Sequence, residues 1–132
     1  MNSFIPWIGG KKLLRKEIVS RFPQEKISKY VEVFGGAGWV LFYKDTNSKQ
    51  QEIFNDYNSE LINLYRCAKY HSQELKRECD LLLNSREMFV DFKSQLKAGG
   101  LTDIQRAARY LYLIKVSFGA DQESYGCSNK NV

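Results

Sequence analysis

Proline is nearly absent from this chain of 132 residues: Pro6 and Pro23 are its two prolines, and everything after residue 23 is free of proline. Long apolar runs are also missing, and none approaches the roughly 18–20 residues that a membrane-spanning helix needs. The first residues lack the apolar stretch of a secretory signal peptide. We therefore expect a cytoplasmic protein without a membrane partner.

Cysteine and histidine are scarce as well. The three cysteines, Cys67, Cys79 and Cys127, are odd in number and form no C-x-x-C pair, which argues against a disulfide framework and a cysteine zinc site. The single histidine, His71, leaves little for a histidine metal site or a catalytic triad, and its position favours a turn between two helices. We expect no metal site.

The rest of the composition is that of a folded domain. Hydrophobic residues make up 43% and charged residues 27%, which excludes a disordered or fibrous chain. The net charge of +5 is uneven: residues 1–30 carry seven Lys or Arg against two Glu, and residues 85–115 carry six against three acidic residues. Two basic zones around an acidic middle fit a phosphate-rich or polyanionic partner, and a solvated basic helix face fits them equally well.

Hydrophobic periodicity predicts an α/β arrangement in residues 1–58. Residues 11–22 have the spacing of an amphipathic helix, and residues 29–34 form a β-branched and aromatic run typical of a buried strand. Gly35-Gly36-Ala37-Gly38 follow and lead into a helix that starts at Trp39, and a second strand is predicted over residues 52–56. Strand, glycine loop, helix and strand are the beginning of a parallel sheet.

From Ser59 onward the pattern becomes helical, and no strand is predicted before Lys115. Gly99-Gly100 interrupt the helical pattern, and Thr102-Asp-Ile-Gln105 matches the capping box that opens a helix. That final helix is expected to run through Lys115. The chain is therefore expected to consist of an α/β part, residues 1–58, and a mainly helical part, residues 59–132.

The glycine loop can be tested against three ligand classes. A phosphate-binding P-loop fails, because its outer glycine would be Ile5 and its hydroxyl residue would be Lys12. A dinucleotide fingerprint that begins at Gly36 and Gly38 needs Gly or Ala where Leu41 stands, so a nicotinamide enzyme is weakly supported. S-adenosylmethionine carries an adenosine without a phosphate and tolerates a looser glycine pattern.

Two acidic residues near this loop have more than one interpretation. Asp56 follows Gly38 by 18 residues, at the end of the second strand, where a carboxylate can accept hydrogen bonds from both ribose hydroxyls. It could also be a helix N-cap or turn residue, a role that Asn58 could equally take. Glu32 lies inside an apolar strand, so it either faces solvent or has a fixed partner such as a lysine.

Three segments together resemble the D12 class of adenine-specific DNA methyltransferases, the DNA adenine methylase family. They read P-W-I-G-G-K over residues 6–11, V-E-V-F-G-G-A-G over residues 31–38 and N-D-Y-N-S-E-L-I-N-L-Y over residues 55–65. The resemblance implies transfer of a methyl group from S-adenosylmethionine to the adenine N6 of double-stranded DNA. It also implies the start of a Rossmann-like cofactor sheet, followed by a helical target-recognition segment.

By the same resemblance, residues of the first segment pack on or beside the cofactor, and those of the second form an F-x-G-x-G-type loop around it. The third segment supplies the acidic residue that holds the ribose. Carried over by position, the cofactor-binding residues are Trp7, Lys11, Phe34, Gly36, Gly38 and Asp56.

The resemblance also assigns DNA contacts to the helical part. Arg106, Arg109 and Lys115 are expected to neutralise phosphates, which would make DNA binding dependent on salt. The segment from Ser117 to Gly126 resembles the start of a DNA-contacting loop. Its aromatic residues, Phe118 and Tyr125, either stack on a displaced base or belong to the core.

The catalytic motif of the family, [DNS]-P-P-[YFW], does not occur, because the chain contains no Pro-Pro. We therefore expect the N-terminal part of such an enzyme, without catalytic residues and without turnover of its own. A non-catalytic DNA-binding or assembly module is the alternative, and a nucleotide-dependent oxidoreductase is a more distant one. An uncovered sheet edge would favour self-association.

Overall fold

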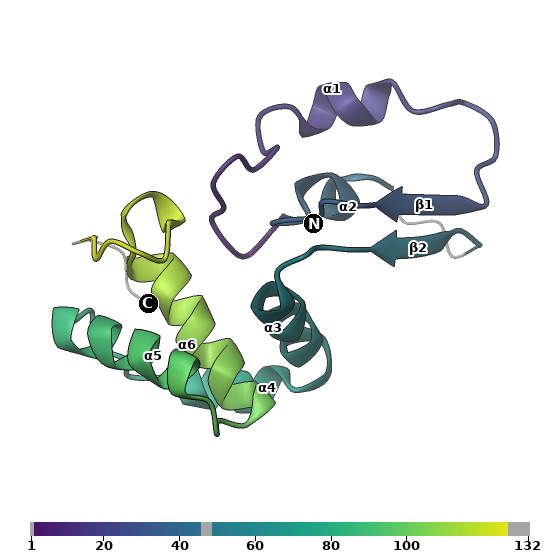
Figure 1. Cartoon of the computed structure of the whole chain (residues 1–132). Coiled ribbons are helices and arrows are strands. Elements are labelled where there is room, and N and C mark those ends of the chain that lie inside the picture. The colour runs from purple at the N-terminus through teal and green to yellow at the C-terminus, as the bar shows by residue number, and fades with distance from the viewer. Residues whose placement is uncertain (1, 46–48, 127–132) are drawn as a thin grey trace. The chain divides into compact units, whose positions relative to one another are not determined.

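The computed structural model describes residues 2–45 and 49–126 and divides into two compact units (Figure 1). The α/β unit comprises the residues up to Phe4 and Gly9–Tyr57, and the helical unit comprises Ile5–Ile8 and the residues from Asn58 onward. Cys127 lies outside the described residues. The described chain is thus a mixed α/β structure with a small parallel sheet and six α-helices.

Two parallel strands form the centre of the α/β unit. β1 (Lys29–Glu32) pairs with β2 (Gln51–Phe54) in a register that places Glu32 opposite Phe54. Helix α2 (Trp39–Tyr43) lies on the connection between the strands, and helix α1 (Arg15–Ser20) precedes β1. The predicted order of elements in this part is therefore confirmed.

Helix α1 is shorter than residues 11–22, which the periodicity predicted. Leu14 occupies its N-cap and has no side-chain oxygen that could accept a hydrogen bond from the first turn. Arg21 ends the helix two residues before Pro23. The missing cap explains why residues 12–14 form turns instead of helix.

The prediction that residues 29–34 form a buried strand is wrong for the described sheet. Val31 is 51% exposed, and Ile53, its partner across the ladder, is 39% exposed. Side chains of a strand alternate between the two faces of a sheet. Tyr30 and Glu32 lie on the face that contacts the ends of α1 and α2, which leaves Val31 and Ile53 on the opposite face.

Four helices and a short loop make up the helical unit. Its helices are α3 (Ser59–Tyr70), α4 (Ser72–Cys79), α5 (Arg86–Ala98) and α6 (Asp103–Val116), and they are followed by a 3-10 turn, η1 (Phe118–Ala120). His71 lies between α3 and α4, as expected. The capping box is confirmed: Gln105 N–H donates to Thr102 Oγ1 at 3.3 Å, and Thr102 N–H donates to Gln105 Oε1 at 3.1 Å.

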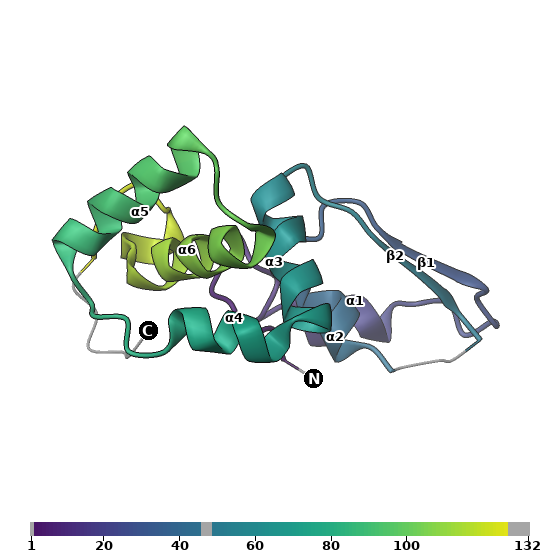
Figure 2. The same cartoon turned by 90° about the horizontal axis from the view of Figure 1, so that it is seen from below.

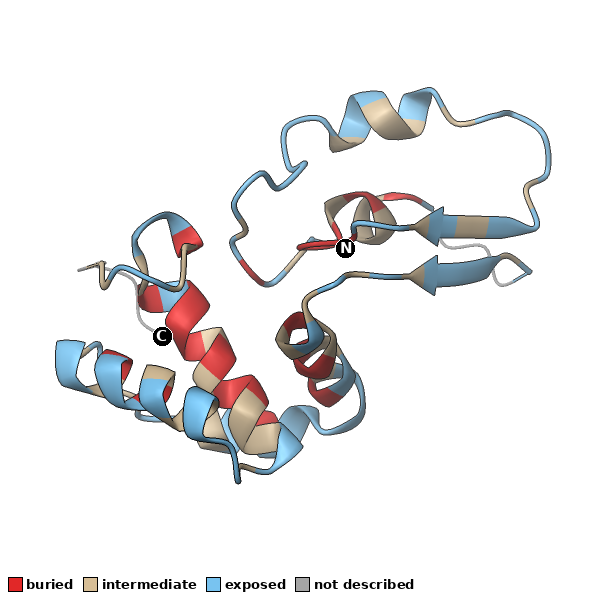
Figure 3. Ribbon diagram, in the orientation of Figure 1, coloured by how far each residue is buried: buried red, intermediate tan, exposed pale blue. Residues whose placement is uncertain are grey.

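Helix α6 is the core of this unit. It packs against α3, α4 and α5, and Figure 2 shows it between α4 and α5. The buried residues gather on α6 and on one side of α3 (Figure 3). Tyr112 is the largest fully buried side chain, and its ring packs edge-on against Phe92 with 5.0 Å between the centroids. None of the described helices is long and apolar enough to cross a membrane.

Candidate functional site

The carboxyl ends of β1 and β2 are tied together by backbone hydrogen bonds. Asn55 N–H donates to the Glu32 carbonyl at 2.8 Å, and Gly35 N–H donates to the Asn55 carbonyl at 2.9 Å. The Asn55 side chain adds a bond from Nδ2 to the Val33 carbonyl at 2.9 Å. Ligands of parallel α/β sheets bind at this edge, so the loops after β1 and β2 form the candidate site.

Asp56 joins the two loops. Gly36 N–H donates to Asp56 Oδ2 at 2.8 Å. The alternative role of Asp56 as a helix N-cap is taken by Asn58, whose Oδ1 accepts from Glu60 N–H and Leu61 N–H, both at 3.1 Å. A carboxylate offers about four lone-pair sites on its two oxygens, which is the type of acceptor that ribose hydroxyls require.

The glycines of the loop have a structural reason to be glycine. Gly36 and Gly38 adopt left-handed conformations, with φ of 50° and 64°. A Cβ at Gly38 would lie 2.8 Å from the Phe42 ring, and a Cβ at Gly35 would collide with the Phe54 ring. The compact loop keeps its backbone close to Asp56, an arrangement that fits the adenosine part of S-adenosylmethionine.

Glu32 has fixed partners, although neither is the lysine that the sequence suggested. Its Oε2 accepts from the Tyr30 hydroxyl at 3.1 Å and from Leu41 N–H at 3.2 Å. Burial raises the pKa of the Glu32 carboxyl, and these two hydrogen bonds oppose the shift. Burial and the nearby Glu32 charge raise the pKa of Tyr30. Lys44, at the end of α2, pairs instead with Glu52.

The remaining cofactor candidates differ in their exposure and in the unit to which they belong. Lys11 is exposed, and its positive charge opposes the rise that burial causes in the pKa of the Glu32 carboxyl. Phe34 is 79% exposed beside the glycine loop. Trp7 is half-buried and belongs to the helical unit. The structure therefore brings together Gly36, Gly38 and Asp56, whereas the roles of Trp7, Lys11 and Phe34 stay predictions.

Sequence reasoning did not find the bond between Glu32 and the start of α2. Two signals pointed to it: a charged residue in an apolar strand, and a glycine where a helix needs a capping side chain. Asn55 was also overlooked, although an asparagine directly before Asp56 at a strand end is a candidate for binding the neighbouring loop.

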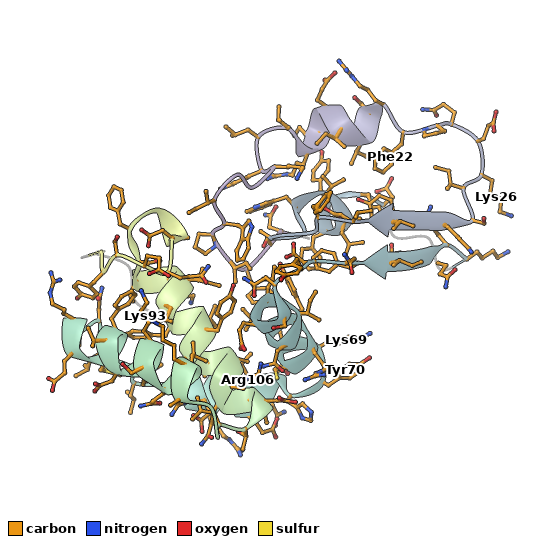
Figure 4. All side chains as sticks on the ribbon, in the orientation of Figure 1. Phe22, Lys26, Lys69, Tyr70, Lys93 and Arg106 are labelled. Carbon is orange, nitrogen blue, oxygen red and sulfur yellow. The ribbon has the colours of Figure 1, made fainter. Side chains whose placement is uncertain are left out.

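Two of the predicted phosphate-binding residues are engaged within the helical unit. Arg106, which Figure 4 labels, pairs with Glu60 at 2.5 Å and with Asp103 at 3.2 Å. Arg109 pairs with Glu78 at 2.8 Å, and its guanidinium lies 5.0 Å from the centroid of the Phe92 ring. These contacts give both arginines a structural role that links α6 to the helices around it.

Lys115 and Phe118, in contrast to Arg106 and Arg109, are exposed. Lys115 is exposed on α6, and Phe118 is 77% exposed in the loop that follows. Tyr125 closes this loop through a bridge to Ser117, donates from its hydroxyl to Asn84 Oδ1 at 2.8 Å and packs edge-on against Phe89. Phe118 is thus accessible to a ligand, and Tyr125 anchors the loop on the helical core.

Arg109→Ala is expected to lower the free energy of unfolding by about 1–3 kcal/mol, because it leaves Glu78 without its charged partner. Lys115→Ala is the matched control on the same helix and should leave stability unchanged within about 0.5 kcal/mol. Urea unfolding followed by circular dichroism measures both. Equal stability of the two variants would contradict the structural role of Arg109.

Comparison with known proteins identifies one family. The family model described as D12 class N6 adenine-specific DNA methyltransferase matches residues 7–132, which include most of both units.

Curated relatives are also named as methyltransferases or DNA adenine methylases. The type II methyltransferase M1.LlaDCHI of Lactococcus lactis subsp. cremoris is 33% identical over 139 residues, which cover 99% of this chain and 45% of that protein. The DNA adenine methylase of Escherichia coli is 29% identical over 121 residues, which cover 89% of this chain and 41% of that protein. The chain therefore spans less than half the length of these relatives.

Proposed function

Because this chain belongs to the D12 class of N6 adenine-specific DNA methyltransferases, we propose that its α/β unit binds S-adenosylmethionine for methylation of adenine N6 in double-stranded DNA. The single observation that carries this proposal is the hydrogen bond from Gly36 N–H to Asp56 Oδ2, 2.8 Å long, at the carboxyl edge of two parallel strands. It places a carboxylate beside a glycine loop, as binding of an adenosine requires.

In this proposal each of the candidate residues contributes to binding of S-adenosylmethionine. Asp56 accepts the ribose hydroxyls, Gly36 and Gly38 let the backbone approach the adenosine, and Phe34 and Trp7 pack on it. Lys11 supplies a positive charge beside the cofactor. Bound S-adenosylmethionine supplies an electrophilic methyl group on its sulfonium. The strands and glycine loop are the start of a Rossmann-like sheet.

We further propose that the chain does not turn over by itself. Orienting the adenine amine in line with the methyl group is a large part of such catalysis, and the family uses its Pro-Pro motif for that purpose. No Pro-Pro occurs among the 132 residues. The chain would then contribute cofactor binding, while the adenine is held by residues outside it.

The helical unit is proposed to contact DNA, with its named residues in two roles. Lys115 neutralises a phosphate, and Phe118 stacks on a displaced base, since both are exposed. Arg106, Arg109 and Tyr125 hold the helices and the loop in place through their internal contacts. A location in the cytoplasm belongs to the same proposal.

Isothermal titration calorimetry tests the cofactor assignment. We expect the chain to bind S-adenosylmethionine, and binding to strengthen when the chain is joined to the remainder of a family member. NAD is the comparison ligand, because an oxidoreductase would prefer it. Absence of heat with S-adenosylmethionine in both forms would end the assignment.

The second candidate is a DNA-binding or assembly module without a cofactor. The basic residues 1–30 favour it, since they carry seven Lys or Arg against two Glu. Such a module would bind duplex DNA in a salt-sensitive manner, with the same affinity in the presence and absence of S-adenosylmethionine. If the chain is part of a methyltransferase, its affinity for DNA should change when S-adenosylmethionine is added.

We also propose that copies of the chain associate through the sheet. In the described residues the sheet has two strands, so β1 and β2 each have one unpaired edge. Sedimentation at high protein concentration should show an associated species, and substituting the exposed Val31 with Lys should reduce it. A strictly monomeric profile at all concentrations would contradict this interface.

A further inference from the structure

Helix α2 begins without a capping side chain of its own. Its N-cap is Gly38, in a left-handed conformation with φ of 64°, and no side-chain hydrogen bond from this residue caps the helix. The first N–H groups of any helix need acceptors from outside it. The acceptor for Leu41 N–H, in the third helical position, is Glu32 Oε2 at 3.2 Å. A carboxylate from β1 therefore does the work of the missing cap.

The Glu32 carboxylate is held in place for this purpose. The Tyr30 hydroxyl donates to the same oxygen at 3.1 Å. The centroid of the Tyr30 ring lies 5.7 Å from the centroid of the Phe22 ring and 4.9 Å from Lys44 Nζ. Figure 4 shows Phe22 at the end of α1. Tyr30, which supports Glu32, is therefore itself contacted by residues that follow α1 and α2.

Two carboxylates therefore bind backbone amides on either side of Gly38 in the sequence. Asp56 binds Gly36 N–H before Gly38, and Glu32 binds Leu41 N–H after it. We propose that Glu32 is a positioning residue, which fixes the start of α2 and so keeps the glycine loop in the conformation that binds S-adenosylmethionine. This inference rests on the proposed function of the loop, and it assigns to Glu32 no contact with the cofactor.

The role of Glu32 has a characteristic dependence on pH. Lys11 is the charged group that acts on the Glu32 carboxyl, and Lys44 and Glu52 act on Tyr30, its hydrogen-bond partner on the same strand. Because burial raises the pKa of Glu32, the carboxyl takes up a proton at a higher pH than a solvated glutamate does. A protonated carboxyl is a weaker acceptor for Leu41 N–H. Cofactor affinity is therefore expected to fall as the pH falls through this pKa.

Folding stability responds to the same proton in the opposite direction. A raised pKa means that the folded chain binds the proton more tightly than the unfolded chain does. The contribution of Glu32 to stability is therefore largest at low pH and declines as the pH rises through its pKa. Protonation of Glu32 therefore does not unfold the chain at low pH. A loss of cofactor affinity there can be separated from unfolding.

Two substitutions at Glu32 test the inference. Glu32→Ala should accelerate hydrogen exchange of the Leu41 amide and weaken S-adenosylmethionine binding, each by about tenfold, as expected for loss of a helix cap. Glu32→Gln keeps an acceptor oxygen, so it should keep binding within about threefold of the wild type and remove the pH dependence. Glu25→Gln, an exposed glutamate of the same unit, is the control and should change neither quantity.

The possible results separate the inference from the proposed function. Unchanged exchange at Leu41 in Glu32→Ala overturns the cap, and unchanged cofactor binding despite faster exchange overturns the positioning role. If the wild-type chain binds no S-adenosylmethionine while Leu41 still responds to Glu32→Ala, the proposed function fails and the cap is supported. Should Glu32→Ala not fold, the pH profile of Glu32→Gln decides: a profile like that of the wild type contradicts the inference.

Discussion

Asp56→Ala is expected to weaken S-adenosylmethionine binding by about 100-fold, since a hydrogen bond to a charged group contributes about 1.5–3 kcal/mol. The substitution removes the acceptor for the ribose hydroxyls. It also removes the acceptor for Gly36 N–H, so the glycine loop loses its link to the loop after β2. Calorimetric titration of the variant and the wild type measures the change.

Two further variants show whether the effect belongs to the carboxylate of Asp56. Asp56→Asn keeps one acceptor oxygen and should weaken binding by about tenfold, an intermediate effect. Asp45→Ala removes an exposed aspartate of the same unit, after α2, and should bind as the wild type does. Equal affinity of Asp56→Ala and wild type would remove the main support for the proposed cofactor site.

Tyr112→Ala is expected to have the largest effect on stability, a loss of about 3–5 kcal/mol, because it empties the centre of the helical core. Tyr112 is fully buried, and its ring packs against Phe92. Its hydroxyl donates to the Leu83 carbonyl at 2.7 Å and accepts from Ser85 N–H at 3.1 Å. The side chain thus joins α6 to the segment that leads into α5.

Tyr112→Phe separates the hydroxyl from the ring. It should cost about 1–3 kcal/mol, because the Leu83 carbonyl and Ser85 N–H then lose a partner. Tyr70→Ala removes a tyrosine of the same unit that is 65% exposed, and it should leave the urea midpoint near that of the wild type. A Tyr112→Ala variant with the wild-type midpoint would contradict the assignment of the core to α6.

Local features of the sequence were the most predictable. The Thr102–Gln105 capping box, the break at Gly99-Gly100 and the turn at His71 depend on residues a few positions apart, and the structure has all of them. The glycine loop between a strand and a helix was equally readable. Its glycines need positive φ or lie against aromatic rings, and both constraints are local.

Contacts between distant residues could not be read in this way. Arg109 pairs with Glu78, 31 positions earlier, and Arg106 pairs with Glu60, 46 positions earlier. The positive charge of an arginine predicts phosphate binding, but it does not show whether a distant glutamate already pairs with that arginine. The exposure of Val31 depends on how many elements cover a sheet face. The choice between Asp56 and Asn58 as a helix cap was likewise settled by geometry.

Backbone amide spectra recorded by nuclear magnetic resonance during a titration with S-adenosylmethionine test the central claim most directly. The account predicts that the amides of Gly36, Gly38 and Asp56 shift together and saturate, while buried amides of the helical core, such as those of Leu64 and Ala107, keep their positions. Shifts confined to the helical unit, or spectra that do not change at saturating S-adenosylmethionine, would contradict it.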